Sequence, residues 1–337
     1  MVSPNLSRFF IAVPFVFSLF IAQPVHANEV VVYSARIEQL IKPMFDAFTK
    51  ETGIKVKYTT DNEGALLARL EAEGKNTPAD MLITADVGNL WAAAQKGLLK
   101  PVESGVLERN IPAHLRDPGN TWFGLSIRAR TLVYNTKKVN PAELSTYEDL
   151  ADPKWSKRLC LRTSKKVYNQ SLVAMMIAEH GEAETEKIVK GWVANLATDP
   201  LSDDTRALEF VAAGKCDVTL VNTYYFGRLM KNDPNLPLAI FWPNQDSSGV
   251  HVNISGAGVT RHARNEQAAI KLLEFLSSDK AQNLFADVNM EYPANPKIAA
   301  DPFVAGWGSF KQNPMNLIKA GELQTTAVKL MDRAGYQ

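Results

Sequence analysis

The chain has 337 residues, carries 37 Lys and Arg against 36 Asp and Glu, and is 46% hydrophobic. This near-neutral balance argues against nucleic acid or an anionic membrane as the partner, because both normally recruit a basic excess. We therefore expect a small ligand. The length exceeds what one hydrophobic core usually holds, so we also expect two lobes.

The N-terminal segment has the pattern of a secretory signal. Residues 1–27 carry one charge, Arg8, followed by an apolar run over 9–22 and a small-residue end, VHA. The run is shorter than the ~20 residues that a membrane helix needs. We therefore expect export, cleavage before Asn28, and no membrane insertion of the mature chain, which would have 36 basic and 36 acidic residues once Arg8 is removed.

The first hundred mature residues alternate strand and helix patterns. Helical spacing places Leu40, Ile41, Met44, Phe45 and Phe48 on one face of a helix that ends at Gly53. Around it we expect strands at 29–33, 55–59 and 80–84 and further helices at 65–73 and 90–96. Such alternation predicts a mainly parallel sheet flanked by helices.

Two extended segments connect this part to a second β/α series. Segment 122–135 (WFGLSIRARTLVYN) crosses between lobes near Ser126, and 252–260 (VNISGAGVT) returns, because its glycines let backbones approach closely. The second series has expected strands at 158–161 and 217–221 and helices at 171–179, 184–194 and 204–213. We predict an α/β fold with a first lobe of 28–126 plus 253–300, a second of 127–252 plus 301–337, and a ligand cleft between them.

Three tyrosines stand out at the edge of the predicted second sheet. Tyr224 and Tyr225 follow strand 217–221, and Thr223 as N-cap would place both in a first helical turn, where they can converge on one point. Tyr168 lies in a polar stretch between a strand and a helix. Phenolate is a hard anionic donor, and several together suit a highly charged hard cation such as ferric iron. A core aromatic pair and a loop tyrosine are the ordinary alternatives.

Cys160 and Cys216 are the only cysteines of the sequence. An even count in an exported chain favours a disulfide over two buried thiols. The bridge would contribute about 4 kcal/mol through chain entropy, and it would tie together the two strands that lead into Tyr168 and into the Tyr224-Tyr225 pair.

Arginines supply candidate anion ligands. Arg36 follows the first strand, where the start of the next helix offers free N–H groups. Alternation puts Arg128 and Arg130 on one strand face, so that one can reach the cleft while the other pairs with an acid. A carbonate dianion beside two arginines would be neutral, as would Fe(III) with three phenolates. We expect Asp86 and Glu63 to be solvated surface acids.

At these residues the chain resembles the periplasmic ferric-iron-binding proteins of bacterial ABC importers, which have the type II periplasmic binding protein fold. The resemblance covers essentially the mature chain, through VVVYSAR, PADMLITADVGNLW, LSIRARTLVYN, TYEDLADPKW, RTSKKVYNQSLVA and VNTYYFGRL. It implies that Tyr168, Tyr224 and Tyr225 bind Fe(3+). Some members add a histidine or tyrosine directly after the YSxR-type opening, where this chain has Ile37 and Glu38.

That departure favours the subgroup with a synergistic carbonate, held here by Arg36 and Arg128. The resemblance further implies a monomeric periplasmic binding protein that delivers iron to an inner-membrane ABC permease and is not an enzyme. A receptor for an organic anion or polyamine, with the tyrosines as a cation–π wall, is the alternative. A tyrosinate-iron oxygenase is disfavoured because no histidine lies near Tyr168 or Tyr224.

Overall fold

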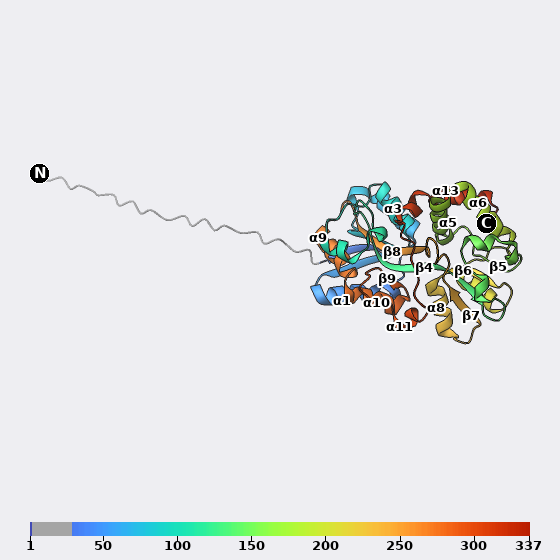
Figure 1. Ribbon diagram of the computed structural model, residues 1–337. Helices are drawn as coiled ribbons and strands as arrows, with labels where there is room; N and C mark the ends of the chain where they lie inside the picture. Colours follow the sequence, from blue (N-terminus) through green and yellow to red (C-terminus); the bar gives the residue numbers. More distant parts are fainter. Residues whose placement is uncertain (2–28) are drawn as a thin grey trace.

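The computed structural model describes Met1 and residues 29–337. The expected signal segment and cleavage point therefore lie outside the described residues, apart from Met1. The described chain forms two lobes side by side, joined in the middle by strands that run across both (Figure 1). No helix in this described part is long and apolar enough for a membrane crossing.

The strands form one continuous path through both lobes, in the order β2-β1-β3-β8-β4-β6-β5, with β7 and β9 each paired to β4. Pairs β1–β2, β1–β3 and β5–β6 are parallel, and β4 and β8 pair antiparallel to their neighbours. The bounds are β1 (Glu29–Ser34), β2 (Lys55–Thr60), β3 (Met81–Thr84), β4 (Phe123–Asn135), β5 (Leu159–Cys160), β6 (Val218–Asn222), β7 (Leu238–Phe241), β8 (Val252–Val259) and β9 (Tyr292–Pro293).

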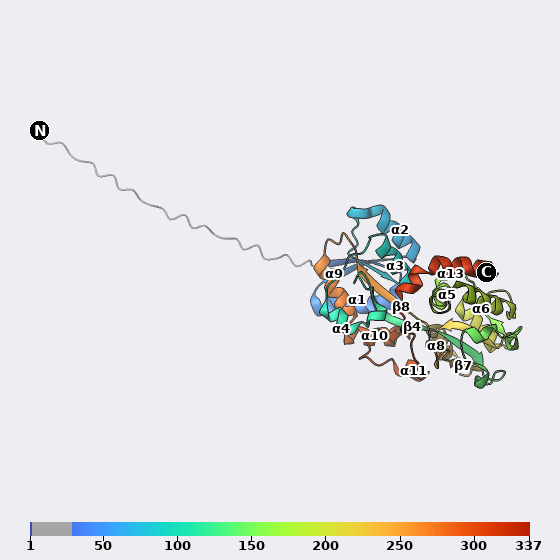
Figure 2. The same cartoon turned by 45° about the horizontal axis from the view of Figure 1, so that its top comes forward.

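Helices cover the sheets in both lobes (Figures 1 and 2). Their bounds are α1 (Glu38–Thr52), α2 (Glu63–Glu73), α3 (Val87–Gln95), α4 (Gly105–Asn110), α5 (Val167–His180), α6 (Glu182–Ala194), α7 (Asp204–Ala212), α8 (Thr223–Asn232), α9 (Glu266–Leu276), α10 (Asp279–Asn289), α11 (Pro302–Ala305), α12 (Ile318–Glu322) and α13 (Gln324–Arg333). Helix α1 illustrates the local logic: Ile41, Met44, Phe45 and Phe48 are buried, and Gly53 ends the helix at φ 74°.

Strand β4 runs through the junction between the two lobes. All of its 13 residues are buried; its first half pairs with β8 and its second half with β6 and β7. Glycines in β8 make the close pairing possible, since a Cβ at Gly256 would lie 2.6 Å from the Phe123 carbonyl oxygen and one at Gly258 would lie 2.5 Å from that of Thr121. The two-lobed α/β fold with two crossover strands is confirmed, whereas the residue boundaries of the lobes stay a prediction.

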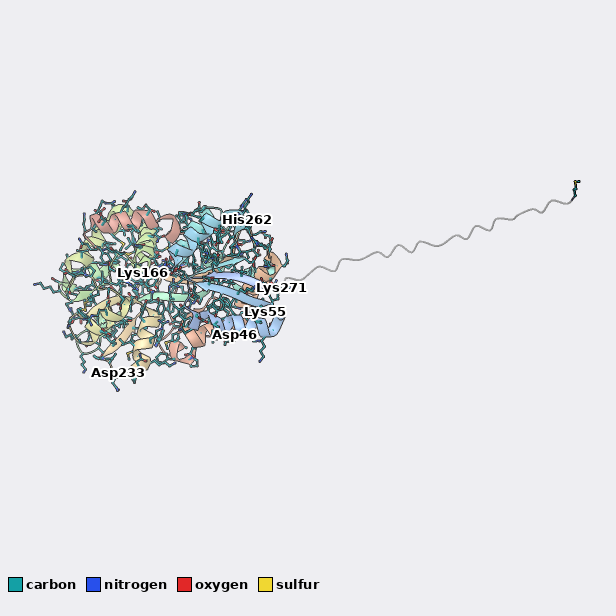
Figure 3. All side chains as sticks on the ribbon, turned by 180° about the vertical axis from the view of Figure 1, so that it is seen from behind. Asp46, Lys55, Lys166, Asp233, His262 and Lys271 are labelled. Atoms are coloured by element: carbon teal, nitrogen blue, oxygen red, sulfur yellow. A yellow bond between two sulfur atoms is a disulfide. The ribbon has the colours of Figure 1, made fainter. Side chains whose placement is uncertain are left out.

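The two lobes have separate hydrophobic cores. The first-lobe core is formed mainly by residues of 30–129 and 250–294. The second lobe has two clusters, one formed by residues of 132–220 and 327–336 and the other by residues of 133–238. Helix α12 lies against both α3 and α5 and so contacts both lobes. The charged side chains of Asp46, Lys55 and Asp233 are exposed, and the half-buried Lys166 lies near the middle of the face seen in Figure 3.

Candidate metal centre

The paired tyrosines lie in the first turn of α8, as the sequence suggested. Strand β6 ends at Asn222, and α8 begins at Thr223. The rings of Tyr224 and Tyr225 lie with centroids 4.4 Å apart and planes inclined by 37°. The expectation that Thr223 is the N-cap was wrong: Asn222 is the N-cap, with extended backbone, and its side chain makes no capping hydrogen bond.

Tyr168 reaches the same place from a different element. It lies in the first turn of α5, one turn earlier than the helix that the sequence predicted, and not in a loop. Its hydroxyl oxygen accepts a hydrogen bond from the Tyr224 hydroxyl at 3.1 Å. Phenol oxygens from the starts of two helices are thus in contact, and the Tyr225 ring lies tilted beside that of Tyr224.

A disulfide joins Cys160 to Cys216, with Cα atoms 5.9 Å apart. Cys160 ends β5, and Cys216 precedes β6, which is the parallel neighbour of β5. Both cysteines are buried. The bridge therefore links the two strands whose continuations carry Tyr168 and the Tyr224-Tyr225 pair.

Arg36 and Arg128 meet at one serine. Both guanidinium groups donate to the Ser255 hydroxyl, Arg128 at 3.2 Å. Each also has an acidic neighbour. Nη1 of Arg36 lies 3.1 Å from Oε2 of Glu291, and Nη2 of Arg128 lies 3.7 Å from Oδ2 of Asp86. Both arginines already face a carboxylate. Their two positive charges therefore no longer favour a carbonate dianion by charge balance alone.

Within the described chain, one nitrogen of each arginine has no hydrogen-bond partner, Nε of Arg36 and Nη2 of Arg128. Both residues are buried, with 5% and 2% of their surface exposed. A buried donor without a partner is costly, and it is satisfied when a small acceptor binds.

Asp86 is not the solvated acid that the sequence predicted. It caps α3 by accepting from the Gly88 N–H at 2.8 Å, and its other oxygen accepts from Asn253 at 2.8 Å and from Ser171 at 3.3 Å. The Asp-x-Gly spacing before a helix is an N-cap signal that could have identified it. Burial raises the pKa of Asp86 to about 6, against the attraction of Arg128. Glu63 is half-buried.

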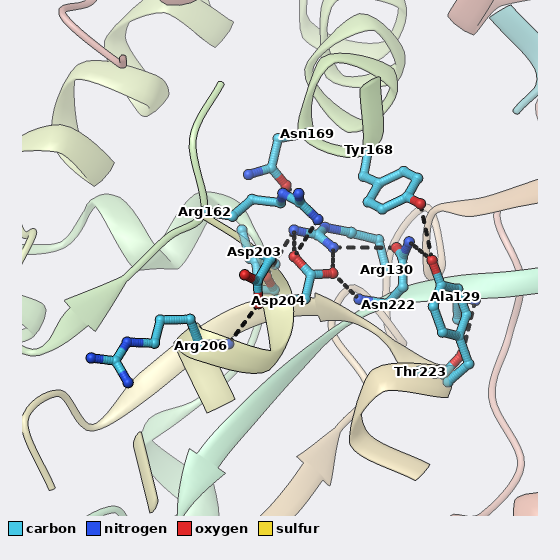
Figure 4. A network of polar contacts seen from close by, with 12 residues as sticks. Ala129, Arg130, Arg162, Tyr168, Asn169, Asp203, Asp204, Arg206, Asn222 and Thr223 are labelled. Atoms are coloured by element: carbon cyan, nitrogen blue, oxygen red, sulfur yellow. Dashed lines mark hydrogen bonds and ion pairs between the residues drawn. The ribbon is translucent and has the colours of Figure 1, made fainter. Parts of the chain in front are cut away.

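Arg130, like Arg128, lies beside an acid, so strand alternation alone does not divide their roles. Arg130 pairs with Asp204 through both terminal nitrogens, whereas Arg128 lies 3.7 Å from Asp86. Arg162 also contacts Asp204, at 3.2 Å. Figure 4 shows Arg130, Arg162 and Asp204 clustered to the left of Tyr168. Asp204 and Arg162 were not singled out from sequence, and neither carries a local motif.

Burial dominates the electrostatics of the phenols. It raises the pKa of Tyr168 to about 12, although the Arg128 guanidinium opposes the rise. Burial, together with Tyr168 and Tyr225, raises the pKa of Tyr224 well above its ordinary value. Cations nevertheless surround these rings: the guanidinium carbon of Arg162 lies 5.1 Å from the Tyr168 centroid, and that of Arg228 lies 5.1 Å from the Tyr224 centroid.

The segment after Arg36 offers no ligand turned to this centre. Ile37 is 59% exposed, and Glu38 is exposed and accepts a hydrogen bond from Tyr58 at 2.7 Å. Glu291 is the first-lobe acid that lies near the centre instead, and it also accepts from Ser126 at 2.6 Å. Its partner Arg36 is 255 positions away in the sequence, so no local pattern could have revealed it.

A second group with metal-ligand chemistry consists of Glu148, Glu179 and His180. His180 Nε2 lies 2.8 Å from Glu148, Asn244 donates to the same carboxylate, and Asn313 donates to Glu179. These groups satisfy one another, as a structural polar network does.

Comparison with known proteins gives consistent matches. Residues 43–312 match the family model described as bacterial extracellular solute-binding protein. Iron uptake protein A1 of Synechocystis is 43% identical over 320 residues, which cover 93% of this chain and 89% of that protein. The major ferric iron-binding protein of Neisseria meningitidis serogroup B is 27% identical over 92% of this chain and 93% of its own.

Solved structures agree with the sequence matches. The Trichodesmium IdiA (FutA) protein in complex with iron and citrate ligands has a TM-score of 0.89 and 42% identity, and covers 92% of this chain and 100% of that one. Ferric iron-binding protein A of Mannheimia haemolytica, in an open conformation, has a TM-score of 0.87 and 36% identity over 92% and 99%.

Proposed function

The chain belongs to the bacterial extracellular solute-binding protein family, and from this premise we propose that it captures ferric iron between its lobes through the phenolate oxygens of Tyr168, Tyr224 and Tyr225. The relatives are iron-binding and iron-uptake proteins and not enzymes, so the role is binding and delivery without turnover. The resemblance noted from the sequence is confirmed at the level of this family.

One observation carries the choice of ligands. The Tyr168 and Tyr224 oxygens lie 3.1 Å apart, and the ring of Tyr225 lies beside that of Tyr224. Two helix starts bring these groups together, and replacing both phenol protons with a hard trivalent cation would turn the contact into a chelate.

A small anion completes the proposed coordination. Carbonate, or a small carboxylate in its place, would accept from Nε of Arg36 and Nη2 of Arg128, which have no hydrogen-bond partner in the described chain. Both arginines also donate to Ser255 through Nη1. This support comes from the two partnerless donors and not from net charge, since Glu291 and Asp86 already face these arginines.

Family membership supports a role in delivery. Solute-binding proteins of this kind serve ABC importers, and we propose a periplasmic monomer that hands iron to an inner-membrane permease. Lobe opening would then occur where β4 and β8 cross the junction, with the lobes divided near Ser126 and Val252 as expected from the sequence.

Titration with ferric iron tests the proposal. Iron loading is expected to give a visible phenolate-to-iron charge-transfer band, and Tyr224→Phe or Tyr225→Phe is expected to remove most of it with the fold intact. Tyr292→Phe is the matched control, because the buried Tyr292 hydroxyl has no hydrogen-bond partner in the described chain.

The opposite outcomes are clear. A colourless protein that binds one equivalent of ferric iron would contradict tyrosinate ligation. A protein that binds no iron but holds an organic anion or polyamine would support the alternative receptor.

A further inference from the structure

We propose that Asn222 is a positioning residue that aims a hydrogen-bond donor at the Tyr224 oxygen, and that the buried Arg130–Asp204 pair holds it there. This inference rests on the proposed function, in which Tyr224 is an iron ligand. It adds a residue outside the ligand set on which the strength of iron binding depends.

The side chain of Asn222 is used in an unusual way for its position. Asn is among the favoured N-cap residues because its oxygen can accept from the first free N–H groups of a helix. Asn222 stands at the N-cap of α8 and makes no such bond. Its amide Nδ2 donates instead to the Tyr224 oxygen at 3.3 Å, and its Oδ1 accepts from Arg130 at 3.2 Å.

Arg130 fixes the two helix starts relative to each other. Its Nε donates to Asn169, the neighbour of Tyr168, at 2.9 Å, and its Nη2 donates to the Leu220 carbonyl of β6 at 2.8 Å. With Asn222 on Nη1, one guanidinium group therefore contacts the residues next to two proposed ligands. Arg130 is only 2% exposed, so water does not compete for these bonds.

Asp204 completes the assembly. It binds the terminal nitrogens of Arg130, accepts from the backbone N–H of Asn222 at 2.9 Å, and lies 3.2 Å from Arg162. Figure 4 shows the carboxylate at the centre of these contacts. Both the backbone and the side chain of Asn222 are thus held, and the direction of its amide is set.

The bond from Asn222 favours the iron-bound state. A phenol accepts a weak neutral hydrogen bond, whereas a phenolate accepts a charge-assisted one that is about twice as strong. When Tyr224 gives up its proton to bind iron, the Asn222 donor is already in place and needs no reorganisation. A purely structural asparagine would support the fold equally with and without iron.

A matched pair of isosteric variants separates the two roles. Asn222→Asp keeps an acceptor for Arg130 and loses the donor to Tyr224. Asn135→Asp is the control: Asn135 is as buried as Asn222, but its side chain accepts from the Lys137 N–H and donates to the Val211 carbonyl, outside the Arg130 network. Iron affinity is measured by citrate competition at one fixed pH, together with the charge-transfer maximum and the melting temperature of the iron-free protein.

We expect similar losses of melting temperature in both variants. Only Asn222→Asp should weaken iron binding, by about 10- to 100-fold, the effect of one hydrogen bond to a charged group, and only it should shift the charge-transfer maximum. Asn222→Leu, which removes the donor without adding charge, gives the same readout if the Asp variant does not fold.

Unchanged affinity and band in the Asn222 variants, or equal losses in the Asn135 control, would overturn the positioning role. If the wild-type protein itself gave no charge-transfer band with iron, the proposed function would fail instead, so the two failures are distinguishable.

Discussion

Iron binding should release protons, because the proposed ligands are protonated in the iron-free protein. Burial raises the pKa of Tyr168 to about 12 and that of Tyr224 well above its ordinary value. Ionising Tyr168 at pH 7 therefore costs about 7 kcal/mol, five pH units at ~1.36 kcal/mol each. The metal must supply this energy, and the displaced protons go to solvent.

The sign and size of the pH dependence follow. Lower pH stabilises the protonated phenols and hence the iron-free protein, so affinity should fall as pH falls. Two protons from Tyr168 and Tyr224 predict a loss of at least ~100-fold in affinity per pH unit. The slope should stay constant between about pH 6 and 9, since a pKa of about 12 lies above that range.

Proton counting at constant pH measures this directly. Iron is added as ferric nitrilotriacetate to weakly buffered protein, and the base needed to hold the pH is compared with the same addition to buffer alone. The count is then corrected for the proton that the released nitrilotriacetate takes up. We expect at least two protons per iron, and about one fewer for Tyr168→Phe. Release of less than one proton per iron in the wild type would refute phenolate ligation by this pair.

Three further predictions concern the surroundings of the centre. The double replacement Cys160→Ala with Cys216→Ala should lower the free energy of unfolding by about 4 kcal/mol, given the sequence separation of 56; a change below ~1 kcal/mol in denaturant titration would contradict this. Arg128→Lys keeps the charge but loses the planar donor fork, so the dependence of iron affinity on bicarbonate should shrink; an unchanged dependence places the anion elsewhere. Gly227→Val would put a Cβ 2.8 Å from the Trp307 ring and should cost ~1–3 kcal/mol, and an unchanged melting temperature would show that Trp307 moves freely.

Local sequence patterns predicted those helices, strands and turns that are determined by residues close together in the sequence. The face of α1 and its Gly53 end, the long extended β4, and the β6–α8 turn with its tyrosines all depend on neighbouring residues. Helix α5 shows the limit. Its N-cap is Lys166, whose side chain makes no capping hydrogen bond, so nothing in the sequence marks a start before Tyr168.

Long-range partners could not be predicted. Asp86 and Glu291 are buried because arginines from distant segments neutralise them, and burial of an acid depends on that partner and not on its neighbours. The same holds for Asp204, which lies 74 positions from Arg130. At Asn222 the local rule favoured Thr223 as the cap, and tertiary contacts directed the amide to Tyr224 instead.

The position of β8 has a consequence for how the chain folds during synthesis. Strands β3 and β4 belong to the first lobe sheet but do not pair with each other; β8 stands between them, with Ala257 facing both Ile83 and Phe123. As the chain is made from its N-terminus onward, the edges of β3 and β4 that β8 will cover therefore stay unpaired until residue 259 has been made. Such edges are prone to pair with other chains. The first lobe cannot complete its sheet ahead of the second, so the nascent chain needs to be kept apart from its copies until most of it has emerged.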